Sequence, residues 1–182
     1  MMRPLQIFAA ALCLFLAGCG NGKVYPKPLT SMHEALAEVD DLPPVFGSAA
    51  PKLSRDVSEP SAVTWIVAVR GSEIMRFVAK LQPEGEQSTR MVLDLVGVTS
   101  GAHGNVQERL EEQPEIKKLY LVAMTEQIES SLEDRPFDIT RTYGALMAAA
   151  GANLGSISQS ADAAADAGRK RREENIQGTA SN

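Results

Sequence analysis

Residues 62–69 read AVTWIVAV, a run of β-branched and apolar side chains. A run that is apolar on both faces is typical of a buried strand. Gly71-Ser72 can form a two-residue turn, and residues 74–81 then alternate between apolar and mixed positions. After a break, residues 89–98 form a third alternating stretch. The sequence therefore predicts three antiparallel strands in a meander, which form the centre of the fold.

The predicted turn also sets how the first two strands pair. With that loop, Val69 lies opposite Ile74, and Trp65 lies opposite Val78. Arg76 is then diagonal to Trp65 on the same face, within reach of the indole. Further charged side chains are expected on this face, at Lys80, Arg90 and Asp94. The face is open to two interpretations: a polar recognition surface around the only Trp, or a partly solvated sheet face with one cation–π contact of about 0.5–1 kcal/mol. We take the second as the default.

A long helix is expected after the meander. Pro114 suits the first turn of a helix. Apolar residues recur behind it at helical spacing, namely Ile116, Leu119, Tyr120, Ala123, Met124, Ile128 and Leu132. This stripe predicts an amphipathic helix that covers the sheet. Asp134-Arg135-Pro136 is expected to end it, and Asn105 to cap a shorter helix in front of it.

The segment before the meander predicts smaller elements. Val24-Tyr25, flanked by Pro, predicts an edge strand. Ser31 and Glu34 match a capping box, which predicts the start of a short helix. Residues 43–60 contain several prolines and predict a loop or a short helical turn. Together these patterns predict an α+β domain over residues 24–136, with an antiparallel meander of about four strands packed on a long C-terminal helix.

Two further segments follow this domain. Residues 137–157 predict an accessory helix, for which Thr140 is a candidate cap. Residues 158–182 are rich in Ala, Ser and Asp without an apolar stripe, which predicts a disordered or frayed helical tail. Its basic run Arg169-Lys170-Arg171-Arg172 has two interpretations: a contact with an anionic lipid or cell-wall polymer, or a solvated helix end with intrahelical ion pairs.

The chain begins with a pattern typical of an export signal. Arg3 is followed by an apolar run over residues 5–16, which is too short to span a bilayer as a mature helix. Small residues then lead directly into Cys19. The sequence Leu16-Ala17-Gly18-Cys19 resembles the lipobox of bacterial lipoproteins. In that family a diacylglycerol is attached to the cysteine, and the signal is cut in front of it.

The lipobox resemblance implies a signal peptide over residues 1–18, a lipidated Cys19, and a tether over residues 19–23. The alternatives are a plain signal peptide that contains Cys19, or a buried N-terminal helix. Acyl chains on Cys19 would anchor the protein to a membrane, with about 0.8 kcal/mol for each buried CH₂. Gly20 stands where Asp resembles an inner-membrane retention signal, which favours the outer membrane and its periplasmic face.

The composition excludes several classes of function. The 182 residues carry a formal net charge of −5, which argues against nucleic-acid binding. Cys13 is lost with the signal and Cys19 is modified, so neither a free thiol nor a disulfide remains for chemistry. His33 and His103 are not spaced as a metal-binding pair. We therefore predict neither a metal nor a cofactor.

The order of the elements resembles the helix-grip fold of START-like and polyketide-cyclase-like proteins. The stretch from Trp65-Ile66-Val67 through Thr89-Arg90-Met91-Val92 resembles the middle of such a domain, although the family usually has seven strands. In that fold a curved sheet wraps a C-terminal helix around an apolar cavity. The resemblance implies a carrier for a hydrophobic molecule. The residues expected to line its cavity are Met75, Phe77, Leu93, Tyr120 and Met124.

Three hypotheses about function follow. The first is a non-enzymatic lipoprotein of the bacterial cell envelope that faces the periplasm and binds another envelope protein or has a structural role. The second is the carrier of a hydrophobic ligand. The third is a hydrolase centred on His103, because Ser100, His103 and Asp94 are residue types of a hydrolytic triad. No nucleophile elbow accompanies them in the sequence.

Overall fold

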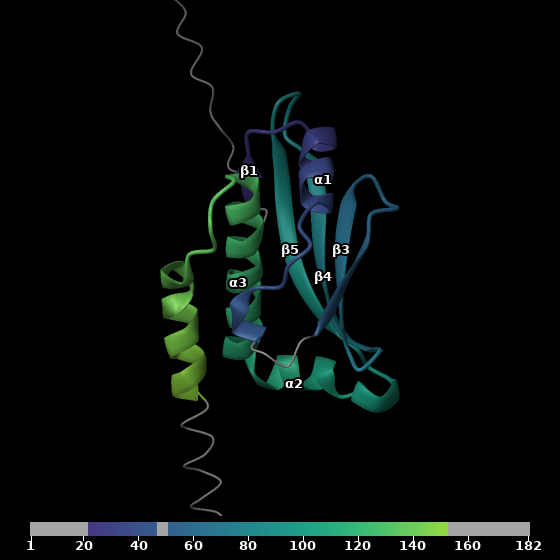
Figure 1. The fold of residues 1–182 in the computed structure, drawn as a ribbon, viewed down its shortest axis with the longest axis vertical. Helices are drawn as coiled ribbons and strands as arrows, with labels where there is room; N and C mark the ends of the chain where they lie inside the picture. The colour runs from purple at the N-terminus through teal and green to yellow at the C-terminus, as the bar shows by residue number, and fades with distance from the viewer. Residues whose placement is uncertain (1–21, 47–50, 153–182) are drawn as a thin grey trace, which may run out of the picture.

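The computed structural model describes residues 22–46 and 51–152 and confirms the α+β fold. Five antiparallel strands form one sheet in the order β1-β5-β4-β3-β2 (Figure 1). The strands are β1 (Lys23–Tyr25), β2 (Lys52–Asp56), β3 (Ala62–Val69), β4 (Ser72–Pro83) and β5 (Thr89–Gly97). The helices are α1 (Leu29–Ala37), α2 (Val106–Glu112) and α3 (Pro114–Leu132), with 3₁₀ turns η1 (Pro44–Phe46), η2 (Gly101–His103) and η3 (Ile139–Thr142). Residues 143–152 form a further helix.

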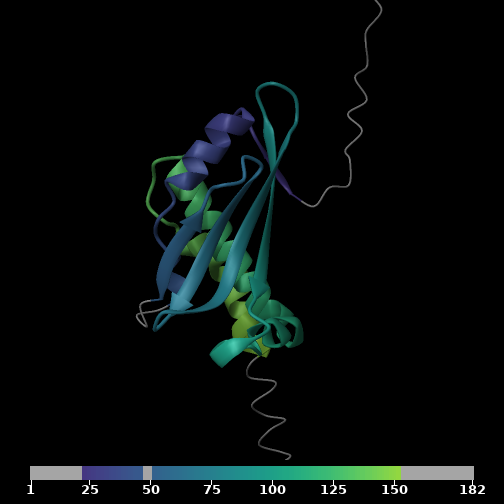
Figure 2. The same ribbon diagram turned by 90° about the vertical axis from the view of Figure 1, so that its right-hand side faces the viewer.

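The core lies between one face of the sheet and the helices α1 and α3. Alternate residues of the central strands point into it, and Trp65, Phe77 and Leu95 are completely buried there. Met32 and Leu36 from α1, with Met124 and Ile128 from α3, fill the other side of the same cluster. The opposite face of the sheet is not covered by any described element (Figure 2). The long helix α3 therefore covers the sheet, as the helical spacing of its apolar residues predicts.

The pairing of β3 with β4 differs by one residue from the prediction. The turn consists of Arg70 and Gly71, whose φ angles of 52° and 81° match the left-handed conformation that a primed turn requires. This turn lies one residue before the predicted Gly71-Ser72 turn, so Val69 pairs with Ser72. A bulge between Val67 and Ala68 then shifts the register by one residue, and Trp65 pairs with Phe77 and not with Val78. A slip of one residue moves a side chain to the other face of a strand. Trp65 and Arg76 consequently lie on opposite faces of the sheet.

The structure adds a strand that the sequence does not predict. Residues 52–56 read KLSRD and form β2 inside the stretch expected to be a loop. They pair with β3, with Leu53 opposite Val67 at the edge of the sheet. Four of the five residues of β2 are exposed, and the strand has no β-branched side chain to signal it. The sheet therefore has five strands where about four are expected.

Some helices begin where the sequence predicts, and others do not. Helix α1 begins at Leu29 behind Pro28, so Ser31 lies inside it and the predicted capping box is wrong. Asn105 precedes α2 as expected, but its side chain makes no capping hydrogen bond. Helix α3 begins at Pro114 as predicted. It ends where Asp134 adopts a φ of 50°.

The end of α3 has the hydrogen bonds of a Schellman motif. The backbone N–H of Arg135 donates to the Ser130 carbonyl at 2.9 Å, and that of Asp134 donates to the Ser131 carbonyl at 3.3 Å. Such a motif reverses the chain, which here leads back along α3 (Figure 1).

The described part of the predicted accessory helix packs on the outer side of α3. Ala145 and Ala149 form a small apolar cluster with Leu119, away from the main core. Asp138, and not Thr140, caps its first turn, because the Asp138 Oδ1 accepts hydrogen bonds from the Thr140 N–H at 2.9 Å and from the Thr140 hydroxyl at 2.6 Å. The predicted tail over residues 158–182 lies outside the described residues.

Gly97 marks a close approach between β5 and α2. A Cβ atom at this position would lie 2.5 Å from the backbone nitrogen of Gln107 and 2.7 Å from its Cα. Because backbone atoms cannot move aside cheaply, we expect Gly97→Ala to lower the free energy of unfolding by about 2 kcal/mol in urea titration. Gly144→Ala is the control, since nothing lies within 4 Å of its added Cβ. Equal stabilities of the two variants would contradict this packing.

Candidate functional site

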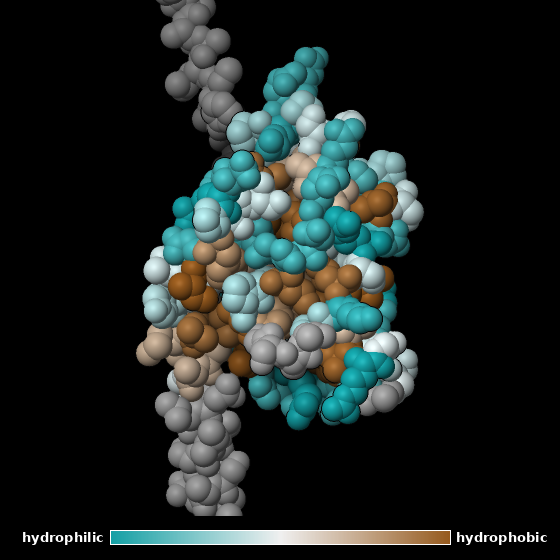
Figure 3. All heavy atoms as spheres, in the orientation of Figure 1, coloured by the Kyte–Doolittle hydropathy of each residue, from teal (hydrophilic) through white to brown (hydrophobic). Residues whose placement is uncertain are grey.

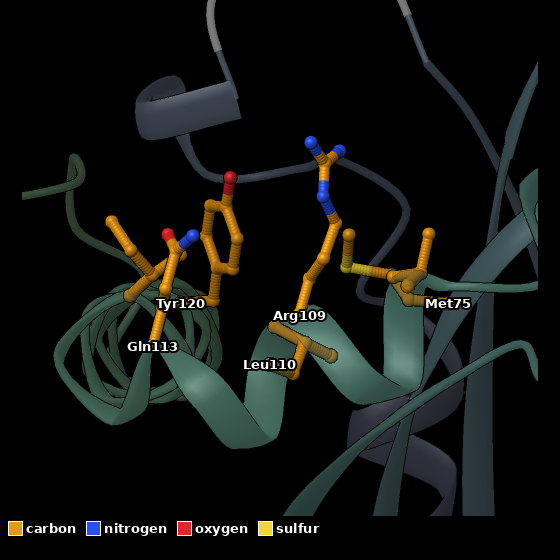
Figure 4. A pocket seen from close by; sticks show the side chains of 7 residues that line it. Met75, Arg109, Leu110, Gln113 and Tyr120 are labelled. Carbon is orange, nitrogen blue, oxygen red and sulfur yellow. The ribbon is translucent and has the colours of Figure 1, made fainter. Parts of the chain in front are cut away.

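A hollow of about 310 Å³ lies where α2 and the first turns of α3 meet the beginning of β4. Its apolar lining consists of Met75 from β4, Val106 and Leu110 from α2, and Ile116 from α3. Three polar side chains complete it, namely Arg109, Gln113 and Tyr120. Figure 4 shows Arg109 and Tyr120 extending to the same side, from α2 and α3, with Met75 facing Arg109. The lining of the hollow is thus about equally polar and apolar, with donor groups beside the apolar side chains.

Aromatic packing fixes the position of Tyr120 in this hollow. Its ring is stacked on Phe46, with 4.7 Å between the centroids and an angle of 11°. Phe46 in turn meets Phe77 edge-on at 6.1 Å, which links the hollow to the core. Within the described part of the chain, neither the Tyr120 hydroxyl nor the Arg109 guanidinium has a hydrogen bond or ion pair to another side chain. Both groups are available to a ligand.

The five residues predicted to line a cavity do not surround one common space. Met75 and Tyr120 line the hollow. Phe77 and Met124 are completely buried in the core cluster, and Leu93 packs against that cluster. The space between meander and α3 is filled, since Trp65, Met32 and Leu36 occupy it. Phe77 and Met124 therefore contribute to packing and are inaccessible to a ligand.

The predicted polar surface around Trp65 is wrong. Trp65 is completely buried, and its indole N–H donates to the Val39 carbonyl at 3.0 Å. Arg76 is exposed on the opposite face and donates to Glu73 at 2.6 and 2.9 Å. Asp94 of β5 pairs with Lys117 of α3 at 3.3 Å. These contacts leave no cation–π pair between Arg76 and Trp65.

Buried charges join α3 to the segment that follows it. Glu126 is only 3% exposed in its side chain and pairs with Arg135, whose Nη2 donates to Oε2 at 3.1 Å. The Asp138 N–H also donates to Glu126 at 3.0 Å, and Arg141 lies 3.4 Å away. Burial alone would raise the pKa of Glu126. The hydrogen bonds from Arg135 and Asp138, with the charges of both arginines, outweigh it and hold the pKa below its ordinary value.

Glu129, one turn further along α3, binds the first strand. Lys23 donates to Glu129 at 2.6 Å, and the Tyr25 hydroxyl donates to the same oxygen at 3.3 Å. The Lys23 ammonium also lies 5.4 Å from the centre of the Tyr25 ring. Burial, followed by the charge and hydrogen bond of Glu129, raises the pKa of Tyr25 far above its ordinary value. These contacts fix β1 to the C-terminal end of α3.

The histidines are not part of a common site. His33 Nε2 lies 3.1 Å from the Glu59 carbonyl oxygen. Among residues 22–46 and 51–152, no hydrogen bond joins Ser100, His103 and Asp94, and no three His, Cys, Asp or Glu residues are grouped to hold a metal ion. The hypothesis that these three residues form a hydrolytic triad therefore has no geometric support in that part of the chain.

Apolar side chains are exposed on the outermost helix. Tyr143 and Met147 are four residues apart on this helix, so they share one face, and Ile139 lies in the 3₁₀ turn η3 directly before it. The three side chains are 41% (Ile139), 53% (Tyr143) and 67% (Met147) exposed. In Figure 3 hydrophobic residues gather at the lower left, over residues 143–152. We call these three residues the apolar stripe.

Comparison with known proteins gave no match to any family model, curated protein or solved structure. The resemblance to helix-grip proteins therefore stays a prediction. Cys19 and the lipobox lie outside the described residues. Of the helices in the described ranges, none combines the length and apolarity required to cross a membrane.

Proposed function

We propose that this protein is a lipid-anchored, non-enzymatic binding protein of the bacterial cell envelope. The observation that carries the proposal is Leu16-Ala17-Gly18-Cys19, at the end of an apolar run that follows Arg3. Two or three acyl chains on Cys19 would give stable anchoring, whereas a single chain binds a membrane only marginally. Gly20 favours the outer membrane over the inner, with the domain on the periplasmic face.

The start of the fold suits a short anchor. Cys19 precedes Lys23, the first residue of β1, by four residues, which span at most about 14 Å when fully extended. Because β1 pairs with β5 and Lys23 binds Glu129, the domain would be held close to the membrane surface.

The proposed role is to bind another protein of the envelope. The apolar stripe supports it, since large apolar side chains on a surface helix are typical of contact sites. A second candidate is a carrier for a hydrophobic ligand, which the hollow beside α2 favours. Its volume is at the lower end of the range of small-molecule sites.

Metabolic labelling with an alkyne-tagged fatty acid tests the anchor. The wild-type protein should incorporate the label when expressed in a bacterium, and Cys19→Ser should incorporate none. Cys13→Ser is the matched control, because Cys13 lies in the segment that is cut off, and it should be labelled like the wild type. Labelling of Cys19→Ser, or an unlabelled wild-type protein, would contradict the proposal.

A further inference from the structure

We propose that the hollow between α2, α3 and β4 binds a single-chain amphiphile with an anionic head group, such as a fatty acid. This inference rests on the second candidate function, the carrier of a hydrophobic ligand, and names the ligand class. The described residues supply both parts of such a site: a cation with two neutral donors, and four apolar side chains along a hollow of about 310 Å³.

The head group would be held by Arg109, Tyr120 and Gln113. Arg109 is exposed and lacks a carboxylate partner within the described ranges, so its charge is not already neutralised. A guanidinium presents two parallel N–H groups to a carboxylate or phosphate. The Tyr120 hydroxyl, fixed by the stack on Phe46, and the Gln113 amide are further donors along the same hollow. This set is complementary to an anion and gives no comparable preference for a cation.

The chain would lie on the apolar floor of the hollow. Met75 and Leu110 are buried, Ile116 and Val106 are half-buried, and all four line the same space. A thioether side chain adapts to ligands of different shape. A volume of about 310 Å³ fits one chain of moderate length. It is too small for a two-chain phospholipid, since ligand sites extend from about 300 to 1,000 Å³.

The position of the hollow excludes the lipid on Cys19 as its occupant. Ile116 lies near the start of α3, whereas Glu129, which binds β1, lies 13 residues later. At 1.5 Å per residue the two points are about 20 Å apart along the helix, and β1, the first described strand, lies at the far end of α3 (Figure 1). Acyl chains in the anchoring bilayer would have to leave it to reach the hollow. The ligand is therefore a separate molecule.

Photolabelling of the full-length protein in its membrane tests this site. The probe is dodecanoic acid with a diazirine in its chain, and tandem mass spectrometry locates the labelled residue. We expect the label on α2, on the first two turns of α3, or on Met75. We expect Arg109→Gln to weaken labelling about tenfold, since a charge-assisted hydrogen bond is lost. Lys118→Gln removes the same charge from an exposed site on α3 outside the hollow and should change labelling less than twofold.

A second variant tests the volume without disturbing the core. Gln113 is exposed, so Gln113→Trp can fill the hollow while the protein stays folded, and it should abolish labelling. Unlabelled dodecanoate should compete with the probe, and dodecanol should compete about tenfold less well. Stronger competition by lysophosphatidylglycerol would identify a phospholipid product as the source of the ligand.

Three results would overturn the proposal: dodecanol competing as well as dodecanoate, equal labelling of Arg109→Gln and wild type, or a label located elsewhere. Incorporation of alkyne-tagged fatty acid at Cys19, measured on the same samples, reports on the anchor alone. A protein that is lipidated but not photolabelled at the hollow would refute this inference and leave the proposed anchor standing. A protein that is photolabelled at the hollow but not lipidated at Cys19 would refute the proposed anchor alone.

Discussion

Trp65→Ala should lower the free energy of unfolding by about 3–5 kcal/mol, the largest loss expected from a single substitution in this domain. The side chain of Trp65 is completely buried in the core. In the sheet, Trp65 pairs with Arg55 of β2 and with Phe77 of β4. The substitution leaves a cavity in the centre of the core. It also leaves the Val39 carbonyl without its donor, because the indole N–H bond of 3.0 Å is lost. Urea titration at constant m value measures the difference.

Trp65→Phe separates the two parts of this loss. Phe keeps most of the apolar area but has no N–H group, so we expect a smaller loss of about 1–2 kcal/mol. A loss below about 1 kcal/mol for Trp65→Ala would contradict the burial of this side chain and the register that places it in the core.

Glu126→Leu should lower the free energy of unfolding by about 3 kcal/mol, the second largest effect expected. Removing one member of a buried ion pair leaves the other charge uncompensated. Here the Asp138 N–H would lose its acceptor, and Arg135, 22% exposed in its side chain, would keep Glu133 as its only carboxylate partner among the described residues. Since these contacts fix the turn after α3, the helix of residues 143–152 should also detach more readily. Hydrogen exchange of that helix and urea titration together measure both effects.

The loss of stability in Glu126→Leu should be larger at neutral pH than in acid. The folded pKa of Glu126 is lower than the ordinary value of about 4.3 that the unfolded chain has. Its stabilising contribution is therefore complete above that value and is lost as the pH falls through the folded pKa. The difference in free energy of unfolding between wild type and Glu126→Leu should accordingly be largest near pH 7 and should decrease in acid.

Glu133→Gln is the control, since Glu133 pairs with the same Arg135 but is 55% exposed in its side chain. It should cost less than about 1 kcal/mol, and a larger cost than for Glu126→Leu would contradict the account.

The sequence predicts best those elements whose side chains are periodic. The strands β3 to β5 and the long helix α3 were expected within a few residues, because their apolar positions recur every second residue or every third to fourth. Strand β2 was missed because KLSRD has no such period and gains its place by pairing with β3. The β3–β4 register differs from the prediction because Arg70 and Gly71 form the turn, and not Gly71 and Ser72. The bulge at Val67 and Ala68, which leaves no clear mark in the sequence, reduces the difference from two residues to one.

The candidate site was predicted only in part. Met75 and Tyr120 were expected to face a ligand and do line the hollow. Arg109 and Gln113 were missed, because the predicted cavity was placed between meander and α3, and the corner with α2 could not be located without the fold. The Glu126–Arg135 pair was also missed. Its members are nine residues apart and meet only because the chain reverses at Asp134.

The central claim is that Cys19 is the lipid-bearing first residue of the mature protein. Mass spectrometry of the intact protein and of its N-terminal peptide, purified from a bacterial envelope, tests it most directly. We predict that the chain begins at Cys19 and that the peptide carries the mass of a diacylglycerol, with or without a third acyl chain. An N-terminus at Met1, or a mature chain with an unmodified Cys19, would contradict the account.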